Sequence, residues 1–476
     1  MILAREQINR YLRHIIMPEI SGPGQKKLLE AAVFVCGETI EAAALAIYYL
    51  AAAGIGRINC RFETAAGFDR LAADIRDLNS DVDIALADSG DSQFRIFLGS
   101  PEFIVRQSEN ITHDFSPSVI ALQHGWKGGV EVCEEPAAAE ALLAALVAGQ
   151  QPAGAGAKEH SPQNGVFGRC FSGALAVMEI VKLILAIGET TADFLYFNLL
   201  SMEFKKSSLQ DFSQIVTELW AVKPEDCQET SLEHGKVLIV GTGGLGSPAA
   251  YALAAAGIGT IGLVDYDVVE ISNLNRQILH AGSRIGMPKV ESAAIFLKEL
   301  NPQLTVNVYN TSLTKDNVFA ILAGYDVVIV AVDNFPARFL LNDACFFAGK
   351  PMIDAGVLRF DGSSMTIVTP AGPCYRCTLP KIPAAGSVPS CSETGVLGAL
   401  PGIMGFIQSA EAAKLLSGQG RLLRGRVVYL DGLFSRFLTL QLNKADNCAL
   451  CGSKPTIHEL QEYEFVCADA TEQVVP

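Results

Sequence analysis

The chain has 476 residues, half of them hydrophobic, with a formal net charge of −15 and twelve cysteines. This length is ample for two domains with their own cores, and the acidic balance argues against nucleic-acid binding, which needs a basic surface. No apolar run reaches the roughly 18 residues of a membrane span, and residues 1–6 do not resemble a signal peptide. Cysteines in zinc-type pairs are typical of the reducing cytoplasm, so we expect a cytoplasmic protein without a membrane partner.

The first part of the chain predicts a helical leader followed by a strand, a loop and an Ala-rich helix. The leader spans residues 5–30, and the apolar residues 33–36 lead into Gly37. The loop that follows carries Glu38 and Glu41 but no further glycine. Because these acids would repel phosphate groups, we expect no nucleotide at this loop.

A second strand, loop and helix follow from residue 237, and here the loop has four glycines. Residues 237–240 are an apolar run typical of a buried parallel strand, and a second run, residues 260–264, ends in Asp265. Glycines let the backbone approach phosphate oxygens, and a helix N-terminus adds a favourable partial charge. An acid at the end of the second strand suits ribose hydroxyls. We therefore predict a nucleotide site that contains Gly241, Gly243, Gly244, Gly246, Asp265 and Asp267, although an acid placed like Asp267 often only solvates a turn.

The residues downstream of this loop indicate what kind of nucleotide chemistry to expect. A lone glycine loop would equally fit a dinucleotide dehydrogenase, but Asn273, Arg276, Gln277 and Lys289 form a polar and cationic set. Adenylyl or phosphoryl transfer needs such cations because charge builds on phosphate oxygens, whereas hydride transfer does not. Asp333 ends another buried strand and would suit Mg²⁺. The alternative is that Asp333 caps the helix that follows.

The two halves of the chain repeat each other. Residues 50–56 (LAAAGIG) recur identically as residues 253–259. Four further pairs match in the same order, namely 33–37 with 237–241, 77–80 with 299–302, 178–183 with 410–415, and 195–198 with 428–431. These matches predict an α/β protein of two tandem Rossmann-like domains with mainly parallel sheets covered by helices. Residues 1–210 would be a degenerate copy with the leader, 211–234 a linker, and 235–476 the active copy with a C-terminal tail.

Four cysteines predict a metal site in the second copy. Cys374 and Cys377 form one CxxC pair, and Cys448 and Cys451 form another. Two such pairs fit tetrahedral Zn²⁺ and leave no open position, so the site would be structural. Redox chemistry at one pair is the alternative, but neither pair has a thioredoxin-like context.

The order and spacing of these motifs over residues 232–467 resemble the ThiF/MoeB/HesA family, the bacterial relatives of ubiquitin-activating enzymes. The resemblance rests on GTGGLG, DYD, SNLNRQ, GMPKVE, AVDN, the two CxxC pairs and PTIHEL. It implies an adenylyltransferase that uses MgATP to adenylate the C-terminal carboxylate of a small ubiquitin-like sulfur-carrier protein, usually ending in Gly-Gly, with release of pyrophosphate. It further implies that Asp265 binds ribose, that Asp333 serves the metal, and that the triphosphate is lined by Asn273, Arg276, Gln277 and Lys289.

The resemblance also implies roles for two residues outside these motifs. Arg13 lies in a segment similar to the Arg-Tyr-x-Arg-Gln start of the family, whose arginine reaches across to the partner's ATP in homodimers. The fused chain would then be a pseudo-dimer with one working site, although a helical arginine is often only at the surface. Cys391 matches the crossover-loop cysteine that forms a thioester or persulfide in several members. A flexible, exposed loop suits a reactive thiol, yet adenylation itself needs none.

Three other functions fit parts of the sequence. The same site could adenylate the C-terminus of a peptide in a natural-product pathway. The chain could instead activate a modifier for ubiquitin-like conjugation, or it could be a non-catalytic scaffold that binds nucleotide. If sulfur is transferred, we expect a separate protein to donate it.

Overall fold

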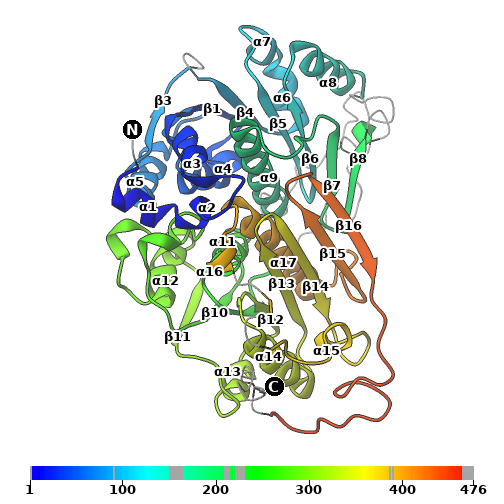
Figure 1. Cartoon of the computed structure of the whole chain (residues 1–476). Helices are drawn as coiled ribbons and strands as arrows, with labels where there is room; N and C mark the ends of the chain where they lie inside the picture. The colour runs from blue at the N-terminus through cyan, green and yellow to red at the C-terminus, as the bar shows by residue number, and fades with distance from the viewer. Residues whose placement is uncertain are drawn as a thin grey trace, which may run out of the picture.

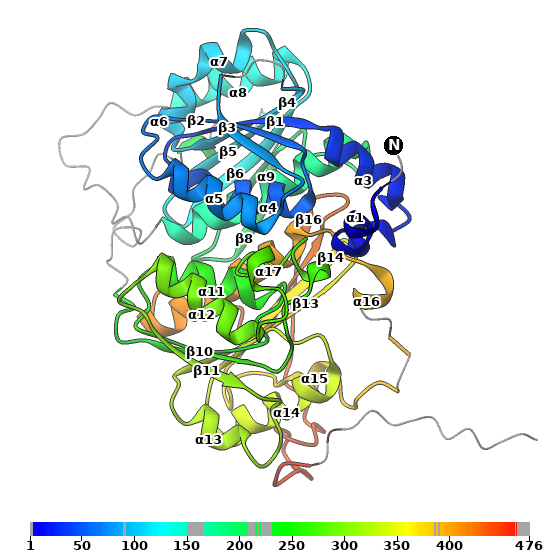
Figure 2. The same cartoon turned by 90° about the vertical axis from the view of Figure 1, so that its left-hand side faces the viewer.

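Two lobes, each built on one eight-stranded sheet, make up the computed structural model of the chain. The structure describes residues 3–88, 92–149, 165–207, 215–217, 219, 231–384, 387–388, 391–461 and 463. Figure 1 shows the first lobe, blue to teal, above the second lobe, green to red, and Figure 2 shows the same division from the side. The expected linker, residues 211–234, lies mostly outside the described residues, and the boundaries at 210 and 235 stay a prediction.

The two sheets have the same strand order. The first sheet runs β3-β2-β1-β4-β5-β6-β7-β8 and the second β11-β10-β9-β12-β13-β14-β15-β16. In each sheet the first five strands pair in parallel and the last three extend the sheet antiparallel. The strands are β1 Ala32–Gly37, β2 Arg57–Phe62, β3 Asp83–Leu86, β4 Phe94–Gly99, β5 Ser118–His124, β6 Lys127–Cys133, β7 Phe194–Asn198, β8 Glu203–Ser207, β9 Lys236–Val240, β10 Thr260–Asp265, β11 Thr305–Asn310, β12 Val327–Val330, β13 Met352–Leu358, β14 Asp361–Ile367, β15 Arg426–Asp431 and β16 Arg436–Gln441. The prediction of two tandem copies with mainly parallel sheets is confirmed.

Helices cover both sheets. Those of the first lobe are α1 Arg5–Arg10, α2 Leu12–Ile15, α3 Ser21–Glu30, α4 Ile40–Ala53, α5 Phe68–Leu78, α6 Pro101–Arg106, α7 Ser108–Thr112, α8 Pro136–Gly149 and α9 Val166–Leu185. Those of the second lobe are α11 Gly246–Ala255, α12 Lys289–Leu300, α13 Val318–Leu322, α14 Phe335–Ala348, α15 Tyr375–Thr378, α16 Cys391–Thr394 and α17 Ala399–Ser417, with short 3₁₀ turns η2 Ile271–Asn273 and η3 Gly282–Arg284. Among the described residues, no helix is both long and apolar enough to cross a membrane.

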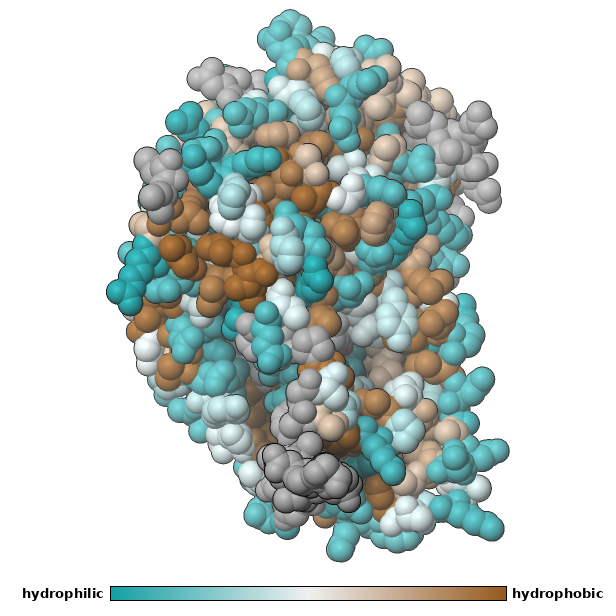
Figure 3. Space-filling model, viewed as in Figure 1, coloured by the Kyte–Doolittle hydropathy of each residue, from teal (hydrophilic) through white to brown (hydrophobic). Residues whose placement is uncertain are grey.

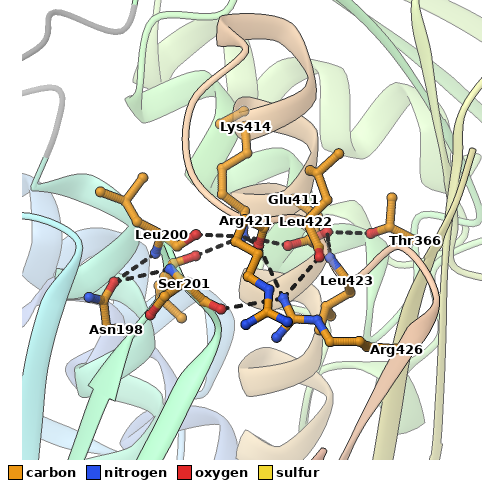
Figure 4. Close-up of polar contacts among 12 residues, drawn as sticks. Asn198, Leu200, Ser201, Thr366, Glu411, Lys414, Arg421, Leu422, Leu423 and Arg426 are labelled. Atoms are coloured by element: carbon orange, nitrogen blue, oxygen red, sulfur yellow. Dashed lines mark hydrogen bonds and ion pairs between the residues drawn. The ribbon is translucent and has the colours of Figure 1, made fainter. Parts of the chain in front are cut away.

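Helices α9 and α17, which occupy equivalent places in the two copies, pack against each other between the lobes. One hydrophobic core continues through both lobes. On one side of this contact Lys414 donates from α17 to the carbonyls of Leu199 and Leu200 in the first lobe, at 2.9 and 3.4 Å. Figure 4 shows the Lys414 side chain pointing toward the Leu200 carbonyl, with Glu411 beside it. On the other side Lys182 of α9 reaches Ser435 of the second lobe.

The outer surface mixes hydrophilic and hydrophobic residues on the face that Figure 3 shows. Figure 3 shows a cluster of hydrophobic residues on this face, at the level of α1 and α2 in Figure 1. Ile8 and Leu12 are exposed on these two helices. The leader therefore sits at the boundary between the lobes, with part of its apolar side open.

Candidate functional site

The glycine loop of the second lobe joins β9 to α11. Gly241 has φ +93°, which favours glycine. A Cβ on Gly246 would overlap the Gly241 carbonyl oxygen, so this glycine lets the helix pack closely on the strand. Gly241, Gly243 and Gly244 line a cavity of about 1150 Å³, whereas Gly246, predicted as a nucleotide contact, does not. Its position fits a packing role instead.

This cavity brings together residues that are far apart in the sequence. Besides the three glycines, its lining includes Arg13, Asp265, Asp267, Asn273, Arg276, Gln277, Lys289 and Asp333. They lie at or just after the ends of β10 and β12, in or just after η2, at the start of α12 and, for Arg13, in α2 of the first lobe. The carboxyl ends of parallel strands are where ligands bind in such sheets.

The two acids after β10 hold the loop and a lysine. Asp265 accepts hydrogen bonds from the backbone N–H and the hydroxyl of Thr242, at 2.8 and 2.9 Å, and from the Asp267 N–H at 3.0 Å. Asp267 in turn pairs with the Lys289 ammonium at 2.8 Å. Lys289 is 7% exposed. The lysine therefore enters the cavity with an orienting partner rather than as a solvated surface charge.

The polar segment after β10 is folded around Arg276. Its guanidinium donates to the Ser272 carbonyl at 2.9 Å and to Asn275 Oδ1 at 2.7 Å. The Asn273 side chain accepts from the Glu270 N–H at 3.0 Å, which closes the turn. Gln277 lies across from Gly243, where a Cβ would come within 3.4 Å of its Nε2. These contacts fix the segment at the cavity wall.

Asp333 lies at the cavity after β12, and it does not cap the next helix. The N-cap of α14 is Asn334, whose Oδ1 accepts from the Ala337 N–H at 2.9 Å. The alternative reading of Asp333 as the helix cap is therefore wrong. Its exposed carboxylate is a hard oxygen ligand of the kind that Mg²⁺ takes.

The four CxxC cysteines converge at one point, next to α15, which packs against α14. Their sulfur atoms all lie within 4.8 Å of one another. Three of the distances are 3.9 Å (Cys374–Cys377), 3.6 Å (Cys374–Cys448) and 3.4 Å (Cys377–Cys451). Thiolates ~2.3 Å from a tetrahedral zinc lie about 3.8 Å apart. The cluster thus has the spacing of a closed zinc site.

Residues 213–450 match the ThiF family. The chain belongs to the ThiF family. Over 235 residues it is 45% identical to a SAMP-activating enzyme E1 from Haloferax volcanii. The aligned residues make up 49% of this chain and 86% of that protein. It is 43% identical over 241 residues, 50% of this chain, to a sulfur carrier protein adenylyltransferase from Thermus thermophilus, of which it covers 89%.

A third relative is longer. The adenylyltransferase and sulfurtransferase MOCS3 of Mus musculus is 44% identical over 240 residues, and this chain spans about half of it (52%). Each of these matches takes up only about half of the present chain. The family predicted from the motifs is confirmed, and names of the relatives agree with the enzyme class predicted.

The first lobe of this ThiF protein has no equivalent loop. Glu38 stands after β1, and its carboxylate accepts from the Ser100 N–H at 2.8 Å and from the Ser100 hydroxyl at 2.9 Å. Phe62 ends β2 as Asp265 ends β10. The carboxylate of Glu38 is thus tied to the residue after β4, and its negative charge would repel a phosphate group at this loop.

His280 and Arg338 support the cavity, although they were not singled out in the sequence. His280 is fully buried behind the loop, with Nε2 3.1 Å from the Thr242 carbonyl and Nδ1 3.0 Å from the Ser292 hydroxyl. Arg338 lines the cavity from α14 and pairs with buried Asp354 at 3.1 Å. Burial raises the pKa of Asp354 to about 6, while Arg338 opposes this rise. Only their closeness to Gln277 and Asp333 in the chain could have pointed to them.

Cys391 begins α16, and its side chain lies outside what the structure describes. The helix packs against α2 of the first lobe and against β13. Val388 and Val396, on either side of Cys391 in the sequence, both line the cavity. Residues before and after Cys391 therefore face the same cavity as the glycine loop.

Proposed function

We propose that the second lobe catalyses ATP-dependent adenylation of the C-terminal carboxylate of a small ubiquitin-like sulfur-carrier protein with a Gly-Gly tail. The carboxylate oxygen attacks the α-phosphorus in line, the bond to the bridging oxygen breaks, and pyrophosphate leaves. The observation that carries this proposal is the single cavity in which a glycine loop meets Arg13, Arg276, Lys289 and Asp333. The printed names of the relatives, which include a sulfur carrier protein adenylyltransferase, support the same reaction.

Each residue has a part that its position allows. The loop glycines admit phosphate oxygens, and the N-terminus of α11 adds a favourable partial charge. Asp265, with Asp267 close by, accepts from the ribose hydroxyls, while Asn273 and Gln277 position the phosphates. The two arginine side chains and the lysine side chain of the cavity offset the negative charge that develops on the transferring phosphate. Alignment of the carboxylate with the α-phosphorus supplies much of the rate.

Two metals complete the proposal. Asp333 would hold Mg²⁺, which when bound neutralises the phosphate oxygens. Cys374, Cys377, Cys448 and Cys451 would hold one structural Zn²⁺, because the sulfur spacing fits and four thiolates leave no position for substrate. Cys391 would act only after adenylation. Its thiolate would attack the acyl carbon of the carrier adenylate to form a thioester while AMP leaves, or it would take the sulfane sulfur of a persulfide on a separate donor protein, whose thiolate is released.

Pyrophosphate exchange into ATP tests the reaction directly. The full chain is mixed with candidate Gly-Gly carriers, with carriers lacking the last glycine, and with short peptides. We expect exchange with intact carriers alone, loss of exchange in Arg276→Ala, and unchanged exchange in Cys391→Ala. Exchange with peptides alone would favour the natural-product reaction. Nucleotide binding without exchange for any acceptor would leave the scaffold function.

A further inference from the structure

The segment after Cys391 re-enters the fold between the two lobes. The Val396 N–H donates to the Arg13 carbonyl of the first lobe at 3.2 Å. The Arg359 N–H donates to the Gly395 carbonyl at 3.2 Å, and the Leu397 N–H donates to the Arg359 carbonyl at 3.1 Å. Gly395 has φ +81°, and a Cβ there would overlap the Arg13 carbonyl oxygen. The backbone that carries Arg13 thus pairs directly with the end of the crossover segment.

A histidine next to Arg13 extends this contact into both lobes. The Gly398 N–H donates to His14 Nε2 at 3.1 Å, and His14 Nδ1 lies 2.9 Å from Gln25 Oε1. Because Nε2 accepts, Nδ1 must carry the proton and donate to Gln25. Gln25 then donates to the Ala53 carbonyl at the end of α4, at 2.9 Å. We call this chain, from Gly398 through His14 and Gln25 to Ala53, the cross-lobe relay.

The relay lies directly behind the cationic segment of the cavity. Gly398 precedes the first residue of α17, and a Cβ on it would overlap the Asn275 carbonyl oxygen, next to Arg276. Pro401, in the first turn of α17, lines the cavity. His14 is fully buried, and burial, with a smaller effect of Arg276, lowers its pKa to about 4. The ring is therefore neutral near pH 7, and Nε2 keeps the lone pair that the Gly398 N–H needs.

We propose that His14 is a positioning residue of the adenylation site, which holds Arg13 of the degenerate lobe in register with Arg276 and with the end of the Cys391 segment. This inference rests on the proposed function and goes beyond it. The first lobe supplies Arg13 and also the hydrogen bonds that set where Arg13 lies. Loss of the Nε2 acceptor leaves a buried N–H without a partner and frees the two lobes to shift at this point.

Amide hydrogen exchange tests the relay without any assumption about the reaction. In His14→Leu we expect the amides of Val396 and Gly398 to exchange about tenfold faster, the fold-change typical of one lost hydrogen bond, while those of β9 stay protected. His14→Gln keeps an acceptor for Gly398 and a donor for Gln25, so it should restore most of the protection. His113→Leu, the same change at an exposed histidine of the same lobe, is the matched control.

Pyrophosphate exchange then tests whether the relay acts through Arg13. We expect His14→Leu to lower kcat about tenfold with a smaller change in KM for ATP, and His14→Gln to recover most of kcat. The double variant Arg13→Ala with His14→Leu should be no slower than Arg13→Ala alone. Additive losses, unchanged amide protection or failure of His14→Gln to rescue would each overturn the inference.

Two outcomes call for a further measurement or variant. Should the wild-type chain support no exchange with any acceptor, the proposed function fails, while amide exchange still tests the relay. Should His14→Leu not fold, Gln25→Leu removes the partner of Nδ1 and leaves the imidazole in place. The same two measurements on that variant decide the question, with faster exchange at Gly398 as the supporting result and unchanged exchange as the opposing one.

Discussion

His280 shows how a single buried side chain supports the glycine loop of the second lobe. Its Nε2 donates to the Thr242 carbonyl, and its Nδ1 accepts from the Ser292 hydroxyl. Thr242 is bound at its other groups by Asp265, so the loop is held from both sides. Burial, and next the nearby Lys289 ammonium, lower the pKa of His280 to about 3. The loop therefore depends on this imidazole being neutral.

The pH dependence of stability follows from that pKa. The unfolded chain takes up the proton near pH 6.5 and the folded chain only near 3, so the stabilisation is complete above pH 6.5 and is lost as pH falls. By pH 5 the loss is about 2 kcal/mol. We expect the free energy of unfolding of the wild type, relative to His280→Asn, to fall by this amount between pH 7 and 5 in urea titrations. The asparagine can still donate to Thr242 but takes up no proton. A pH-independent difference would contradict this account.

Lys289 is the cation whose environment is best defined, because Asp267 fixes its ammonium at 2.8 Å. Removal of one preorganised donor to developing charge typically costs about 10²–10³ in rate. We expect Lys289→Met to lower kcat of pyrophosphate exchange by that factor, and Asp267→Asn to have a smaller effect. Lys236→Met, at an exposed lysine at the start of β9, should change neither kcat nor KM. Equal losses in Lys289→Met and Lys236→Met would show that the ammonium has no specific part.

At the scale of elements, the cysteine cluster is joined to the helix that follows Asp333. Arg376, between the first two cysteines, makes a bidentate pair with buried Asp343 of α14, with distances of 2.9 and 2.8 Å. Its guanidinium also lies 4.7 Å from the ring centre of Phe339. The Tyr463 hydroxyl donates to the same carboxylate at 2.7 Å. The segment of the cysteine cluster thus anchors α14, and α14 carries Arg338 to the cavity.

We expect one zinc per chain, and we expect its loss to loosen α14. Cys377→Ser should reduce bound zinc, measured by release to a chromogenic chelator, and should lower Tm. Arg376→Leu should keep zinc but cost about 3–5 kcal/mol, because it leaves Asp343 buried without its partner. Cys345→Ala, a buried cysteine outside the cluster, should keep the zinc. Full zinc content in Cys377→Ser would rule out the four-cysteine site.

The sequence was most informative where function and fold depend on short strings. The glycine loop predicted the cavity in the second lobe, and the matching residues 178–183 and 410–415 predicted equivalent helices, because each signal lies within a few neighbouring residues. The cross-lobe relay could not be predicted, since Gly398 lies 384 residues from His14. Nor did the motif show that Gly246 packs rather than binds, which depends on how close Gly241 comes to it.

At the scale of the whole molecule, the two lobes meet through equivalent contacts of two buried lysines, Lys182 and Lys414. Lys182 donates to the Glu189 carbonyl at 2.8 Å, and Lys414 donates to the Arg421 carbonyl at 3.0 Å. Glu179 accepts from the Thr191 N–H at 2.9 Å, as Glu411 does from Leu423 at 2.7 Å. The first lobe has thus kept its half of the contact between the lobes, although its loop after β1 lacks the glycines of the second lobe. This pattern fits a lobe retained to complete the site of its neighbour.

The two lysines are matched probes of that contact. Both are buried and lie beside a buried glutamate, and burial lowers the pKa of each while the glutamate opposes this. Removal of one partner of a buried pair costs about 3–5 kcal/mol, so Lys182→Met and Lys414→Met should destabilise the chain equally in guanidinium titrations. Replacing both members, as in Glu179→Gln with Lys182→Met, should recover part of the loss, and Lys205→Met at an exposed position should cost little. A large loss in one lysine variant and none in the other would mean that only one of the two equivalent contacts joins the lobes.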